Sequence, residues 1–247
     1  FDAVLLSGDL NASVWSGPRP GVQGRRRYLV LGAPLLAAFP AHEMRAILAH
    51  EISHRTCSDW LITGGERVIR WLAAILPSTA PFAKATGPYD ALLSWFAPRF
   101  RGLWQVYSWS MEIQADALGA ELGDREAMAA ALCRLAVLES HLDEWFQSEA
   151  RRSYHLEQPP ADLLARWASY LEGLTSDETG KALRLSLESS TRFSHSHPAL
   201  RDRLAALGVP PAVVSFQAEG AWRSWLGGSE TAMGRKFQVW WAAAIAG

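Results

Sequence analysis

The stretch AHEISHR, residues 49–55, places His50 and His54 four residues apart, with Glu51 directly after the first histidine. On a helix, a spacing of four brings two side chains to the same side. Two imidazoles in that arrangement can bind one metal ion, and the intervening glutamate can accept a proton from a water molecule there. The stretch therefore predicts one face of a zinc site, and the alternative is an ordinary helix with a solvated flank.

The helical period around this stretch begins near Pro40, a residue that suits the first turn of a helix. Met44, Ile47, Leu48 and Glu51 fall on one arc, with both histidines on its flank. A carboxylate on the core-facing arc of a helix requires an explanation. We interpret it as the general base of a partly dry cleft.

The third metal ligand must come from another part of the chain. A metzincin would need Gly at 57 and His at 60, where this chain has Cys57 and Trp60, so that class is excluded. The best candidates are Glu112 and Asp116, one helical turn apart in MEIQADA at 111–117. Glu112 would complete a His, His, Glu set, and Asp116 would accept the N–H of a ligand imidazole. The alternative is a solvated pair of acids.

Four separated stretches resemble the HtpX and CAAX prenyl endopeptidase family of zinc metallopeptidases, metallopeptidase family 48, in their order and approximate spacing. They are LNASVW at 10–15, RRRYLVLGAPLL at 25–36 running into HEMRAILAHEISH at 42–54, MEIQADALGAEL at 111–122, and SHPALRDRL at 196–204. The resemblance covers roughly residues 1–207. It implies a zinc metalloendopeptidase of the EC 3.4.24 type that acts on proteins or peptides.

The resemblance implies one zinc ion per chain, held by His50, His54 and Glu112, with Glu51 as catalytic base. Asp116 would contact a ligand histidine without binding the metal itself. This agrees with the roles that the spacing alone suggests.

The resemblance also assigns the pair His197-Pro198 to the site. His197 would approach the metal and either stabilise the oxyanion or cap the zinc at rest, and the alternative is a simple residue at the start of a helix. Arg203 would hold His197 or the substrate. Arg201 is the weaker choice for that role, and His195 is a bystander.

We expect a mainly α fold with a small N-terminal β-sheet or hairpin (α+β), of the zincin-like (gluzincin) type. Extended runs at 3–6 and 26–31, joined by a Gly/Pro-rich turn at 17–24, predict the hairpin, with Arg25–Arg27 as the solvated start of an exposed edge strand. A substrate strand could pair with this edge near Arg26–Leu31. We predict later helices at 60–107 (two, broken at 77–88), 107–122, 125–145, 167–174, 181–187 and 197–208. The peptidase domain would span 1–207, and 208–247 would form a helical tail packed on it or leading to a missing segment.

The composition is that of an ordinary globular protein, with 49% hydrophobic residues. A formal net charge of -1 argues against nucleic acid as a partner. The 12 Trp are interpreted as core residues, with a membrane-interface or partner-binding belt as the alternative. Cys57 and Cys133 are interpreted as reduced thiols, with a bridge between them as the alternative.

The chain begins at Phe1 without a signal peptide and contains no apolar run long enough for a membrane span, so we interpret it as a fragment of a longer protein. Many relatives have membrane-spanning segments between the histidines and the third ligand, whereas residues 60–107 here carry many charges. We therefore expect a soluble or peripheral quality-control peptidase domain, with any anchor of a membrane-anchored bacterial-type protein in segments absent from this chain. The oligomeric state stays open.

Three functional hypotheses remain. The first is an active zinc endopeptidase, the second a binding or adaptor protein on a peptidase scaffold with a capped zinc, and the third a metal-free helical domain. The intact Glu51 favours the first, because a scaffold has no chemical need for a base beside the histidines.

Overall fold

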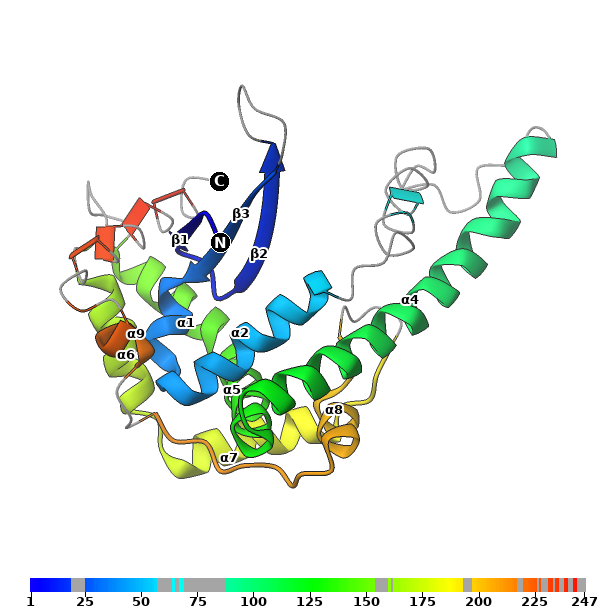
Figure 1. Cartoon of the computed structure of the whole chain (residues 1–247). Helices are drawn as coiled ribbons and strands as arrows, with labels where there is room; N and C mark the ends of the chain where they lie inside the picture. The colour runs from blue at the N-terminus through cyan, green and yellow to red at the C-terminus, as the bar shows by residue number, and fades with distance from the viewer. Residues whose placement is uncertain are drawn as a thin grey trace.

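The computed structural model describes residues 1–18, 25–56, 88–153, 162–192, 197–216 and 220–225, together with single residues or pairs between 64 and 68, at 160 and after 226 (Figure 1). Our predictions for Cys57, for His195 and for most of the helical material at 57–87 lie outside the described residues. Within the described residues the protein has a small sheet and a larger helical part, so the predicted mainly α, α+β fold is confirmed.

The sheet has three strands, β1 (Ala3–Ser7), β2 (Ala12–Pro18) and β3 (Arg25–Gly32), in the order β1-β3-β2. β1 runs parallel to β3, and β2 runs antiparallel to it. The predicted hairpin therefore had the wrong first strand, because β2 and not β1 is the antiparallel neighbour of β3. The prediction of an edge strand was wrong from Tyr28 onward, where β3 is central, whereas Arg25–Arg27 lie beyond the register of β1 and pair with β2. The alternating buried residues of β3, Leu29 and Leu31, belong to the core.

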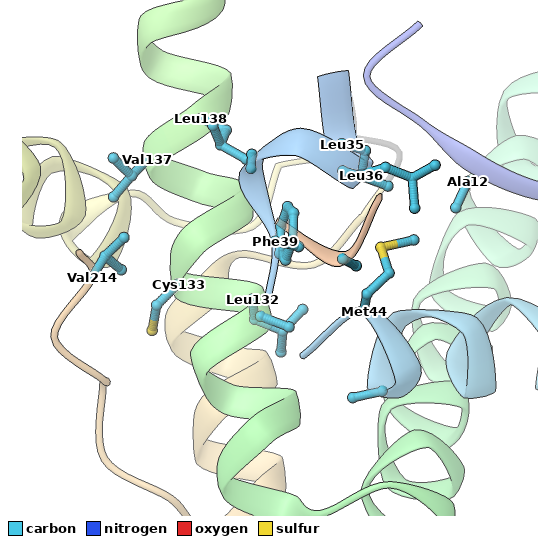
Figure 2. Packing of buried hydrophobic residues seen from close by; sticks show 14 of the residues in the cluster. Ala12, Leu35, Leu36, Phe39, Met44, Leu132, Cys133, Val137, Leu138 and Val214 are labelled. Atoms are coloured by element: carbon cyan, nitrogen blue, oxygen red, sulfur yellow. The ribbon is translucent and has the colours of Figure 1, made fainter. Parts of the chain in front are cut away.

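The chain passes from β3 into α1 (Ala33–Ala38) and then into α2 (Ala41–Thr56), which carries the two histidines. Phe39, between the two helices, and Met44, in the first turns of α2, are fully buried. Figure 2 shows both side chains facing Leu132 of α5, the helix that forms the opposite wall of the core. The core thus anchors the beginning of α2 and fixes the direction in which its later turns point.

Two long helices follow, α4 (Pro88–Leu122) and α5 (Arg125–Ser153). The predicted separate helix from 107 is the C-terminal part of α4, which continues through Pro98 without interruption. Figure 1 shows this C-terminal part beside α2, while the N-terminal part extends away from the body. The two helices approach closely because Gly119 has no side chain, and a Cβ there would lie 3.1 Å from the carbonyl oxygen of Ala46.

The remaining helices pack around α5 and α1. Their bounds are α6 Leu163–Glu172, α7 Ser176–Glu188, α8 Leu200–Leu207 and α9 Ala221–Trp225. Thr175 and Glu178 form a capping box at the start of α7, and α8 ends at Gly208 in the left-handed conformation, φ 68°.

The tryptophans differ in how far they are buried. Trp145 and Trp167 are buried against each other, and the indole N–H of Trp167 donates to the carbonyl of Pro34. Trp15 and Trp95 are exposed, so the interpretation of the tryptophans as core residues does not hold for these two. Among the helices that the structure describes, none has both the length and the apolar character needed to cross a bilayer.

Candidate metal centre

Three side chains from α2 and α4 converge on one point. The Nε2 atoms of His50 and His54 lie 3.0 Å apart. Nε2 of His54 lies 3.2 Å from Oε1 of Glu112, and Nε2 of His50 lies 3.7 Å from its Oε2. Each residue thus offers one ligand atom, and these three atoms lie within 4.8 Å of one another.

The arrangement around His50 suits a metal ion. Its buried Nδ1 lies 2.8 Å from Oδ1 of Asp116, although the N–H direction there is not well aligned for a hydrogen bond. The negative charge of this carboxylate favours the tautomer with the proton on Nδ1, and that tautomer leaves the lone pair of Nε2 directed at His54 and Glu112. Two imidazole nitrogens and a carboxylate oxygen are a donor set that zinc prefers. The residues present therefore fit a zinc ion.

Asp116 is itself held by an arginine of α8. Arg203 donates from Nε to Oδ2 at 2.7 Å and from a terminal nitrogen to Oδ1 at 2.6 Å. Burial alone would raise the pKa of Asp116, but these hydrogen bonds and the contact with His50 lower it below its ordinary value. The ionised form of Asp116 is therefore favoured between Arg203 and His50.

Glu112 is surrounded by histidines. His197, just before α8, places Nδ1 2.6 Å from Oε2 of Glu112. Burial would raise the pKa of Glu112, but the hydrogen bonds with His197 and His54 lower it far below its ordinary value. The same hydrogen bonds raise the pKa of His54 and His197, against the opposing effect of burial. The centre thus attracts positive charge, which a divalent cation would also supply.

Glu51 lies on α2 next to these donors and is half-buried. Burial raises its pKa, and the charges of His50 and His54 oppose this shift. Its side chain lines a cavity of about 610 Å³ together with His50, His197 and Arg203. A carboxyl group with a raised pKa at the edge of a cavity is suited to accepting and returning a proton.

The structure brings together all seven residues that the sequence suggested: His50, Glu51, His54, Glu112, Asp116, His197 and Arg203. His197 contacts Glu112 and is not one of the three residues whose donor atoms converge. Arg201 is exposed and lies 3.5 Å from its neighbour Asp202, away from the centre.

The sequence reasoning missed two other parts of the cavity. One is the beginning of β2, where Asn11 and Ala12 form part of the wall. The other is Glu139 of α5. Both had a signal in the sequence, since residues 12–15 have strand-forming character and Glu139 interrupts an apolar helical stripe.

A His, His, Glu centre between two helices, beneath a small sheet, defines a metallopeptidase domain of the zincin-like class. The sequence model of peptidase family M48 matches residues 7–209, and the chain belongs to this family. This confirms the resemblance to metallopeptidase family 48. No curated protein and no solved structure matches the chain.

Proposed function

We propose that this protein is a zinc-dependent endopeptidase, with His50, His54 and Glu112 as zinc ligands and Glu51 as catalytic base. The observation that carries the proposal is the convergence of three donor atoms within 4.8 Å, next to a cavity that Glu51 also lines. Membership of a metallopeptidase family supports the reaction class. We keep protein quality control as the proposed role.

A zinc ion bound here would polarise the scissile carbonyl and lower the pKa of a water molecule. Glu51 accepts the proton of the attacking water and then transfers it to the leaving amine. Asp116, fixed by Arg203, holds the proton on Nδ1 of His50 and so keeps Nε2 as a donor atom. The partly buried position of Glu51 limits the access of bulk water to this proton transfer.

His197 is placed to act on the substrate. Its side chain is 56% exposed and lines the cavity, while Nδ1 is held by Glu112. We assign it the role of stabilising the negative charge that develops on the substrate oxygen. Capping of the zinc at rest is the alternative that the adaptor hypothesis requires.

An extended substrate would pair with β2. We expected pairing with Arg26–Leu31, but β3 has β1 on one side and β2 on the other, so its backbone groups are already in use. β2 is an outer strand, and its beginning at Asn11 and Ala12 reaches the cavity. Strand addition there would bring a peptide backbone to the centre.

We also propose that residues 1–207 form the peptidase domain and 208–247 a tail packed on it. Two contacts support packing of the tail: Arg134 donates to the carbonyl of Ser215 at 2.7 Å, and the N–H of Ala221 donates to the carbonyl of Phe39 at 2.6 Å.

The substitution Glu51→Gln tests the proposal. It should abolish cleavage of casein while leaving about one zinc ion per chain, because Gln cannot accept the proton and the ligands are untouched. His42→Gln is the matched control, since His42 lies on the same helix with an exposed side chain and should change neither property. Full activity of Glu51→Gln would overturn the assignment, and purified protein without bound metal under non-chelating conditions would favour the metal-free hypothesis.

A further inference from the structure

The wall of the cavity formed by α5 changes character along the helix. The α5 residues that line the cavity recur at the three- and four-residue spacing of one helix face: Met128, Ala131, Leu132, Leu135, Ala136 and Glu139. Five of the six are apolar, and the last is an acid. The α5 wall of the cavity is therefore apolar up to the carboxylate of Glu139, with Met128, Ala131 and Leu132 buried and Leu135 and Ala136 partly exposed.

Among the residues that the structure describes, Glu139 has no counter-ion of its own. In the described part of the chain, no arginine, lysine or histidine nitrogen lies within 4.0 Å of its carboxylate. The positive charges that act on Glu139 are those of His197 and Arg203, and both side chains are hydrogen-bonded to other carboxylates. Arg203 donates to Asp116, and His197 contacts Glu112. Although solvent reaches Glu139, the surrounding walls desolvate its carboxyl group and raise its pKa, and only the distant charges of His197 and Arg203 oppose this.

A second source of negative potential lines the same cavity. Ser186 in the last turn of α7 and Ser189, its C-terminal cap, both line the wall. The C-terminal end of a helix carries partial negative charge on its last carbonyl groups. The last turn of α7 has no basic residue to offset it. Glu139 and this helix end together make a position suited to a cation.

We propose that Glu139 recognises a lysine or arginine side chain of the peptide substrate. The aliphatic stem would lie along Leu135 and Ala136, and the charged group would pair with the carboxylate at the end of this wall. This inference rests on the proposed peptidase function, because it names the substrate class for the same cavity. Glu139 would be a specificity-determining residue rather than part of the proton transfer.

Peptide binding to the zinc-loaded Glu51→Gln protein tests the inference without requiring cleavage. The probes are short fluorescein-labelled peptides that carry Lys, norleucine or Glu at one position, scanned along the sequence, with fluorescence anisotropy as the measurement. Norleucine has the apolar stem of lysine without its charge. We expect Lys at one position to bind about tenfold more tightly than norleucine, the effect of one charge-assisted hydrogen bond.

Two variants in the same background assign the preference to Glu139. Glu139→Gln should remove the preference for Lys, and Glu139→Lys should reverse it in favour of Glu. Asp143→Lys is the matched control, because Asp143 is an exposed acid one turn further along α5 that does not line the cavity, and it should leave the preference intact.

The possible results separate this inference from the proposed function. Equal binding of Lys and norleucine peptides at every position would overturn the inference. So would an equal loss for all three peptides in Glu139→Gln, because that result would mean that Glu139 only positions His197. If the Lys preference appears but the wild-type protein with zinc cleaves none of the peptides, the inference stands and the proposed peptidase function fails.

Discussion

Asp116 of α4 and Arg203 of α8 form a two-point ion pair at 2.7 and 2.6 Å, and the same carboxylate lies 2.8 Å from Nδ1 of His50. Asp116 has no exposed surface, and Arg203 is also buried. The carboxylate of Asp116 therefore connects Arg203 of α8 to His50, a proposed zinc ligand on α2. Loss of this connection should affect both stability and metal binding.

The substitution Asp116→Asn should weaken zinc binding about 10- to 100-fold, as loss of a carboxylate behind a ligand histidine does. It should also lower the free energy of unfolding by about 3–5 kcal/mol, because the buried Arg203 loses its partner. Competition with a chelator and urea denaturation measure the two effects. Asp162→Asn is the control, since Asp162 pairs with Arg166 at the surface and its loss should cost less than about 1 kcal/mol. Unchanged zinc affinity in Asp116→Asn would remove this carboxylate from the metal centre.

Residues at short sequence separation were the predictable part of the site. The spacing of His50 and His54 follows from helical geometry, and Glu112 and Asp116 follow from the same rule one helix later. The stretch around Asp116 is also rich in small residues, and one of them, Gly119, allows α4 to approach α2 closely. Each of these inferences uses contacts within one helix or a property that is visible in composition.

The parts that were not predictable depend on distant contacts. Residues 3–6 and 26–31 do pair, but in parallel, and the sequence alone does not state which strand is central. The partner of Arg203 lies 87 residues away, and the surroundings of Glu139 depend on where α7 ends and where α8 begins. Helix length also escaped prediction: α4 continues through Pro98 as one helix, although a proline inside a helix removes a backbone hydrogen bond.

A second buried ion pair supports the core at the N-terminal end of α2. Arg134 of α5 donates to both carboxylate oxygens of Glu43, at 2.6 and 2.9 Å, and its guanidinium lies over the rings of Phe39 and Phe216. Arg134→Met should lower the free energy of unfolding by about 3–5 kcal/mol, because it leaves a buried carboxylate unpaired.

Urea denaturation of the single and double variants measures this cost. Arg134→Met combined with Glu43→Gln should be more stable than Arg134→Met alone, since the unpaired charge is gone. Arg201→Met, at an exposed position, should change stability by less than about 1 kcal/mol. If the double variant is no more stable than the single, the unpaired charge is not the source of the loss.

His197→Ala distinguishes an active enzyme from a capped scaffold. If His197 stabilises the developing charge on the substrate, kcat should fall about 100-fold or more, while zinc content stays the same because the three donors remain. Steady-state kinetics and metal analysis give the two values. A rise in activity would instead mean that His197 caps the zinc. If the variant holds zinc and neither the variant nor the wild type cleaves any substrate, the adaptor hypothesis is favoured.

Gly220 controls how the tail docks on the body of the protein. A Cβ there would lie 2.4 Å from the carbonyl oxygen of Ala37, at the point where the next residue, Ala221, donates to the carbonyl of Phe39. Because the carbonyl of Ala37 belongs to the backbone and cannot move aside as a side chain would, Gly220→Ala should displace the segment around residue 220 and expose it. Faster hydrogen exchange at Ala221 and faster proteolysis after residue 208 would show this displacement. Gly180→Ala is the matched control: it lies inside α7, where an added Cβ meets only the side chain of Arg184 at 3.5 Å, and should stabilise the helix by about 0.5–1 kcal/mol. Unchanged exchange at Ala221 in Gly220→Ala would show that the tail does not depend on this close approach.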